Sequence, residues 1–289
     1  MASTKNTFGC LDKAFTDYKT SYFAVLPIPY EQTTSYGKGT LSGPKALLEA
    51  SHYLELYDEE TDSNPAELGI TTLPPLLLKK IGGETAEAIR AACSRLYSDN
   101  KFPIVLGGEH SISYGCALAA KDYHPTVSVL HFDAHSDRRD EYHGTRYSHG
   151  SVMARITEAI PAVSVGIRSV SDEESDEVKK LRKDKRLYFA KDILAGNRTK
   201  DILSMLSDKV YISFDVDVFD PSIMPSTGTP EPGGLGWYDI LDILSAIFTY
   251  KDVVGLDVVE LLPDGTRTSD FTAAKLVYKA MAYQARSKN

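Results

Sequence analysis

Short, continuous apolar runs alternate with longer amphipathic stretches along most of this chain, and this alternation is the feature that most constrains its fold. The apolar runs are rich in β-branched residues and lack the in–out alternation of half-exposed strands, so they predict strands buried on both faces. These predicted strands cover residues 22–27, 104–107, 127–132, 163–167, 210–214 and 253–259.

The stretches between these runs have helical spacing. Ile240, Leu244 and Ile247 recur three or four residues apart, and a similar pattern covers residues 86–96. Residues 269–285 are predicted to form a terminal helix capped by Thr268 or Ser269. Repeated strand–helix alternation implies right-handed crossovers. We therefore predict an α/β fold: a single domain over residues 1–289, with a doubly wound, mostly parallel sheet and helices on both faces.

Composition excludes several classes of protein. The 32 Lys+Arg against 40 Asp+Glu give a net charge of −8, which argues against a binder of nucleic acid or anionic membranes. No apolar run approaches the roughly 18 residues of a membrane span, and residues 1–19 lack the apolar core of a secretory signal. The three cysteines have neither disulfide-framework density nor CxxC spacing. We expect a cytoplasmic protein.

Three segments rich in Asp and His follow predicted strands. They are residues 106–111 (LGGEHS), 130–137 (LHFDAHSD) and 213–221 (SFDVDVFDP). Ligand sites in open α/β sheets form outside the carboxyl ends of strands, so these segments are expected to converge. The candidate site residues in these segments are His110, Asp133, His135, Asp137, Asp215 and Asp217. Within the second and third segments they are two residues apart.

A cation is the simplest reason for this cluster. In an extended backbone, residues two apart project to the same side, and carboxylates gathered after apolar strands are unfavourable unless a cation neutralises them. Two His and four Asp are too oxygen-rich for a structural zinc site and suit Mn²⁺. Four carboxylates also match two divalent ions about 3.5–4 Å apart, which acidify a water held between them. A single Asp is more typical of a turn or helix cap, and Asp220, in an Asp-Pro pair, is predicted as one.

Together with residues 255–260 (GLDVVE), these segments resemble the ureohydrolase family, which includes arginase and agmatinase. The resemblance implies an arginase-like fold and a binuclear manganese centre that hydrolyses a guanidinium group to urea and an amine. Residues 139–142 (RDEY), 147–150 (YSHG) and 228–234 (GTPEPGG) are most similar to agmatinase. Arg139 stands where arginases are expected to carry an Asn.

The resemblance also implies residue roles. One metal would be held by His110, Asp133, Asp137 and Asp215, and the other by His135, Asp133, Asp215 and Asp217. Asp137 would assist proton transfer and His149 would shuttle protons, although a surface or helix-start histidine remains an alternative for His149.

The resemblance pairs Glu260 with the substrate guanidinium. Its position supports this independently, because a lone carboxylate closing an apolar run needs a partner and a planar guanidinium provides one. Asp257 lies in the same run and competes for that role, with a structural hydrogen bond as its other fate. His131 is predicted as a core histidine or one that orients a ligand.

Agmatine, cleaved to putrescine and urea, is the expected substrate. N1-aminopropylagmatine, guanidinobutyrate, formimidoylglutamate and arginine remain alternatives; a substrate carboxylate would need a cationic contact such as Arg139 or Arg146. A metal-dependent phosphoesterase and a catalytically silent metal-binding homologue are the alternatives from other classes. The expected partner is a small cationic guanidino compound, with no nucleic acid and no membrane, and the resemblance suggests a homo-oligomer, either a trimer or a hexamer.

Overall fold

The computed structural model describes residues 7–196 and 198–287 and contains one eight-stranded sheet in the order β2-β1-β3-β8-β7-β4-β5-β6. Every neighbouring pair is parallel. The strands are β1 (Phe23–Ile28), β2 (Ile70–Thr72), β3 (Phe102–Gly107), β4 (Ser128–Phe132), β5 (Ala162–Ile167), β6 (Leu187–Phe189), β7 (Lys209–Asp215) and β8 (Asp252–Val259).

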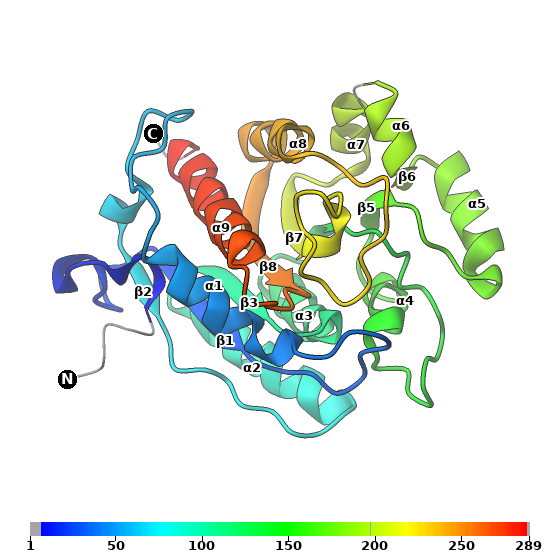
Figure 1. Cartoon of the computed structure of the whole chain (residues 1–289), viewed down its shortest axis with the longest axis horizontal. Helices are drawn as coiled ribbons and strands as arrows, with labels where there is room; N and C mark the ends of the chain where they lie inside the picture. Colours follow the sequence, from blue (N-terminus) through cyan, green and yellow to red (C-terminus); the bar gives the residue numbers. More distant parts are fainter. Residues whose placement is uncertain (1–6, 197, 288–289) are drawn as a thin grey trace.

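All six predicted strands are present, and β2 and β6 are additional. Both are three-residue strands at the two edges of the sheet. Such short strands contain too few apolar residues to stand out in the sequence. The last strand in the chain, β8, lies between β3 and β7, as Figure 1 shows. It therefore joins strands β1 to β3 on one side of the sheet to strands β4 to β7 on the other.

Helices pack on both faces of the sheet, as predicted. They are α1 (Gly43–Ser51), α2 (Gly83–Ser98), α3 (Ser113–Tyr123), α4 (Val152–Thr157), α5 (Ser175–Lys183), α6 (Ala190–Leu194), α7 (Thr199–Met205), α8 (Trp237–Tyr250) and α9 (Thr268–Arg286). One face packs against α1, α8 and α9, and the opposite face packs against α2, α3 and α4.

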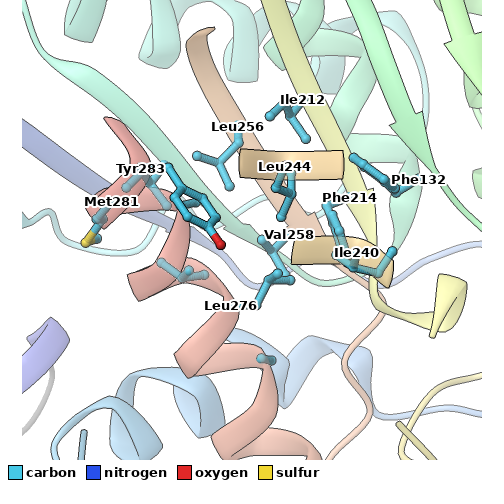
Figure 2. Close-up of a cluster of buried hydrophobic side chains, with 14 of the residues drawn as sticks. Phe132, Ile212, Phe214, Ile240, Leu244, Leu256, Val258, Leu276, Met281 and Tyr283 are labelled. Carbon is cyan, nitrogen blue, oxygen red and sulfur yellow. The ribbon is translucent and has the colours of Figure 1, made fainter. Parts of the chain in front are cut away.

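The alternation of side chains along β7 explains the two cores. Ile212 and Phe214 point into the core shared with α8 and α9, which Figure 2 shows, whereas Tyr211 points into the other core. The core with α8 and α9 includes Leu244 and Leu276, both almost completely buried. The central strands are therefore covered on both sides, and only their ends are free to form a site.

The predicted cap of the terminal helix is wrong. Arg267, in the left-handed region with φ 65°, precedes α9, and no side chain caps its first turn. The Ser269 hydroxyl instead accepts a hydrogen bond from the Ser226 N–H at 3.2 Å, so it ties a loop to the helix. In the described part of the chain, no helix is long and apolar enough to cross a membrane.

Candidate metal centre and substrate cavity

The six predicted ligands lie together at the carboxyl edge of the sheet. His110 begins a 3₁₀ turn after β3, residues 133–137 follow β4, and Asp215 and Asp217 lie at the end of β7. Glu260 follows β8, the strand between β3 and β7. Asp137 and Glu260 have positive φ angles of 52° and 65°, a conformation that is uncommon outside glycine and tends to occur at functional sites.

His110 presents a free nitrogen to three carboxylates. Its Nδ1 lies 3.2 Å from Asp133 Oδ2, 3.2 Å from Asp137 Oδ2 and 3.4 Å from Asp215 Oδ2, and this buried nitrogen forms no hydrogen bond with any described residue. On the other side of the ring, Nε2 lies 3.0 Å from the Ser213 hydroxyl.

The residues behind His110 show which nitrogen carries the proton. The Ser213 hydroxyl donates to Asp257 Oδ1 at 3.0 Å, so it can only accept from His110 Nε2–H. In its neutral form, His110 therefore directs the Nδ1 lone pair at the carboxylates, which is the arrangement of a metal-binding histidine. Asp257 also accepts from Ser113 and Tyr211, both at 2.8 Å, and so has the structural role considered for it.

A second group of ligand atoms lies on the other side of Asp133. His135 Nδ1 is 2.8 Å from Asp217 Oδ2 and 3.5 Å from Asp133 Oδ1. Asp133, His135 and Asp217 offer atoms within 4.8 Å of one another, and so do His110, His131 and Asp133. Asp133 belongs to both groups. The donor set therefore fits hard divalent cations, and Asp133 contributes an oxygen to both groups.

Both ring nitrogens of His131 have partners. Its Nε2 lies 2.8 Å from Asp133 Oδ2 and its Nδ1 lies 3.1 Å from the Ser164 hydroxyl. The ring is fully buried. These contacts fit the predicted role of a histidine that orients a ligand.

Without a cation, the cluster takes up protons instead. Burial raises the pKa of Asp215, and the negative charges of Asp217 and Asp133 raise it further, to well above its usual value. Burial lowers the pKa of His135, but Asp217 and Asp133 outweigh it and raise that pKa to about 12. Both shifts show a shortage of positive charge, which divalent ions would supply while displacing protons.

Glu260 is a buried carboxylate beside this cluster. It is 8% exposed, and its Oε1 accepts a hydrogen bond from the His110 N–H at 2.7 Å. Burial and the nearby charge of Glu109 raise the pKa of Glu260 well above its usual value. Within residues 7–196 and 198–287 it forms no ion pair, so a buried anion here lacks a cation.

His149 lies at the start of the 3₁₀ turn before α4 and contacts the loop after β1. Its Nδ1 is 3.1 Å from the Thr33 hydroxyl and its Nε2 is 3.0 Å from the Ser35 hydroxyl. The Tyr142 ring packs edge-on against it, with centroids 5.5 Å apart. Burial lowers the pKa of His149.

One cavity of about 240 Å³ joins these groups. Its lining includes His110, Asp137, Asp215, Asp217, His149 and Glu260. Arg139 also lines it, but its Nε is paired with Glu173 Oε1 at 2.9 Å and its guanidinium stacks on Tyr142 at 4.5 Å from the ring centroid. Arg146 is paired with Asp140 and Glu158 and does not line the cavity.

Glu231 also lines the cavity. It lies in the segment of residues 228–234 that resembles agmatinase, but the sequence alone gives it no role. Its backbone carbonyl accepts from the Arg168 guanidinium at 2.8 and 3.1 Å, which fixes the loop. Its half-buried side chain lines the cavity and, among the described residues, forms no hydrogen bond or salt bridge. Glu174, another lining carboxylate, is already held by Ser136, Ser171 and the Arg138 N–H.

A cluster of imidazoles and carboxylates at the carboxyl edge of a parallel α/β sheet is the arrangement of a metal-dependent hydrolase. The model of the arginase family matches residues 21–283. An N(1)-aminopropylagmatine ureohydrolase from Synechocystis sp. is 38% identical over 288 residues, covering 96% of this chain and 93% of the relative. An agmatinase from Pyrococcus horikoshii is 36% identical over 286 residues, covering 93% and 94%.

The fold agrees with these relatives. The crystal structure of an agmatine ureohydrolase from Thermoplasma volcanium superposes with a TM-score of 0.85 at 30% identity, covering 94% of this chain and 93% of that one. The chain belongs to the arginase family, and it is a ureohydrolase.

Proposed function

We propose that this protein hydrolyses agmatine to putrescine and urea, as a single domain over residues 1–289 with two Mn²⁺ ions. The observation that carries the proposal is Glu260, a buried carboxyl group that pairs with no cation in the described part of the chain and lines the same cavity as the cluster of His and Asp residues. A guanidinium is a planar cation that satisfies such a carboxylate through paired hydrogen bonds.

His110, Asp133, Asp137 and Asp215 would hold one ion, and His135, Asp133, Asp215 and Asp217 the other. When bound, the ions supply an acidified water as the nucleophile. Glu260 holds the guanidinium carbon beside the cluster, with Oε1 already fixed by the His110 N–H. Because the planar guanidinium is held in one orientation, its carbon is positioned for attack, and part of the binding energy lowers the activation barrier.

Proton transfer falls to two residues. Asp137 lies at the cavity wall next to His110 and accepts a proton at its carboxylate. His149, whose pKa is lowered by burial, is neutral at rest, takes up a proton from solvent and transfers it to the departing amine, which returns the imidazole to its neutral form. A positioned acid–base group of this kind contributes about 10²- to 10⁴-fold to rate.

Glu231 is proposed to bind the distal ammonium of the substrate. We expect Glu231→Gln to raise the KM for agmatine about 5-fold, roughly 1 kcal/mol for one charge-assisted contact, with little change in kcat. Steady-state kinetics with agmatine and with butylguanidine, which lacks the amine, check this. An equal rise in KM for butylguanidine would show that Glu231 supports the loop rather than the amine.

N1-aminopropylagmatine is the second candidate substrate, because relatives 38% identical to this chain carry that activity in their names. Guanidinobutyrate and formimidoylglutamate fit less well, because the charge of Arg139 is offset by Glu173 and Tyr142. Arg139 and Arg146 therefore offer little to a substrate carboxylate.

A side-by-side urea assay on the Mn²⁺-loaded protein separates these candidates. We expect the highest kcat/KM with agmatine, and kcat/KM at least about 10-fold lower with guanidinobutyrate, as expected for an unmatched charge worth about 1.4 kcal/mol. A higher kcat/KM for N1-aminopropylagmatine than for agmatine would make the longer amine the substrate. A preference for guanidinobutyrate would overturn the assignment to an amine substrate.

The remaining proposals are a cytoplasmic location and assembly into a homotrimer or homohexamer. The similarity to the arginase family supports the assembly. Light scattering on the purified protein measures it directly, and a monomer would contradict it.

A further inference from the structure

Glu109 is a buried carboxylate that the proposed metal and substrate contacts leave unused. It is completely buried, and its two oxygens accept four hydrogen bonds. The donors are the N–H groups of Gln32 and Thr33, at 2.5 and 2.6 Å, and the hydroxyls of Thr33 and Ser111, at 2.8 and 2.6 Å. The two N–H groups can only donate and occupy Oε2, and the two hydroxyls donate to Oε1.

This arrangement fixes what the Thr33 hydroxyl can do on its other side. Its single hydrogen points to Glu109 Oε1, so toward His149 it can only accept. The His149 backbone N–H and the His149 Nδ1 both lie 3.1 Å from Thr33 Oγ1. The proton of the neutral imidazole is therefore on Nδ1, where Thr33 accepts it.

The other ring nitrogen is then a free base. His149 Nε2 lies 3.0 Å from the Ser35 hydroxyl, which in turn lies 3.0 Å from the Tyr142 hydroxyl. His149, Ser35 and Tyr142 all line the cavity that contains Glu260. Ser35 can donate to Nε2 and accept from Tyr142, so the free nitrogen lies on the polar side of the ring that borders the cavity.

We propose that Glu109, acting through Thr33, is a positioning residue that fixes the Nδ1–H tautomer of His149 and so makes Nε2 its proton-transferring atom. The inference rests on the proposed function, in which His149 protonates the departing amine. The proton stays on Nδ1 throughout, donated in a hydrogen bond to the Thr33 hydroxyl, while Nε2 takes up a proton from solvent and passes it to the amine nitrogen. An acid–base imidazole whose tautomer is fixed by an orienting carboxylate is the arrangement found in catalytic triads.

Two substitutions give different predictions for the tautomer. Glu109→Gln keeps an oxygen for the backbone N–H groups and turns its amide NH₂ toward the Thr33 hydroxyl. Thr33 must then donate to His149 Nδ1, which moves the imidazole proton to Nε2. Thr33→Val removes the acceptor and leaves the tautomer unfixed, whereas Thr33→Ser keeps the hydroxyl.

Nitrogen-15 NMR of histidine-labelled protein reads the tautomer directly, without substrate and in both the metal-free and the Zn²⁺-loaded forms. His149→Asn assigns the signals. We expect a protonated Nδ1 in the wild type and in Thr33→Ser, a protonated Nε2 in Glu109→Gln, and a mixture in Thr33→Val. Thr34→Val is the matched control, because the Thr34 hydroxyl contacts Glu31 instead, at 3.3 Å, and its tautomer should match the wild type.

The kinetic counterpart is a fall in kcat of about 100-fold for Thr33→Val, with KM little changed and with recovery in Thr33→Ser. A protonated Nε2 in the wild type, or the same tautomer in all variants, would overturn the positioning role even if urea is released. If the tautomers change as predicted but no guanidino compound yields urea, the positioning stands and the proposed function fails.

Discussion

Replacing Asp133 with alanine is expected to abolish metal binding and urea release together. Asp133 is completely buried, and it is the residue shared by the two described groups of ligand atoms. Its Oδ2 lies 3.2 Å from His110 Nδ1, and its Oδ1 lies 3.5 Å from His135 Nδ1. Its removal takes a ligand from both proposed metal positions, so we expect kcat/KM to fall by at least about 1,000-fold, since bound metal supplies several kcal/mol.

Metal content by elemental mass spectrometry and urea release by colorimetric assay check this prediction on the same samples. Asp122→Asn is the matched control, because Asp122 is a surface carboxylate paired with Arg90. We expect the control to keep metal and activity. An Asp133→Ala protein that retains two ions or releases urea at the wild-type rate would disprove the ligand assignment.

Replacing Glu260 with glutamine is expected to lower kcat/KM for agmatine by about 100- to 1,000-fold. This corresponds to about 3–4 kcal/mol, the cost of removing one partner from a buried charge pair. Glutamine keeps the oxygen that accepts from the His110 N–H, so the loop and the metal content should be unchanged. Only the pairing with the guanidinium is lost.

Glu260→Gln should also be at least as resistant to heat as the wild type when no substrate is bound. The native protein buries a carboxyl group that has no cationic partner among the described residues, and the raised pKa of Glu260 reflects the cost of ionising it there, which the neutral amide avoids. Thermal unfolding with and without agmatine measures both effects, with the surface substitution Glu84→Gln as a control. Loss of metal or a lower melting temperature would make Glu260 a structural residue.

The sequence is sufficient to predict the central strands and the cluster at their ends, because both depend on local patterns. Continuous apolar runs mark strands covered on both faces, and Asp133, His135 and Asp137 share a side because they are two residues apart. The edge strands β2 and β6 have no such pattern, since each has only three residues. The side-chain cap predicted for α9 at Thr268 or Ser269 is wrong, because a loop contact uses the Ser269 hydroxyl.

Contacts between distant loops have no local signal at all. Thr33 and His149 are 116 residues apart, and only the fold brings the hydroxyl to the imidazole. In the same way, the sequence allows Arg139 to be a free cation that contacts a substrate, whereas in the structure it forms an ion pair with Glu173. Glu109 lies inside a recognisable motif, but its partners Gln32 and Thr33 come from the loop after β1.

The most direct test of the proposed activity is a time course of agmatine hydrolysis by the Mn²⁺-loaded protein, with urea and amine measured in the same samples. We predict that urea and putrescine accumulate in a one-to-one ratio, and that removing the metal with a chelator stops both. A loaded protein that releases no urea from agmatine or N1-aminopropylagmatine, while it cleaves p-nitrophenyl phosphate, would contradict the account.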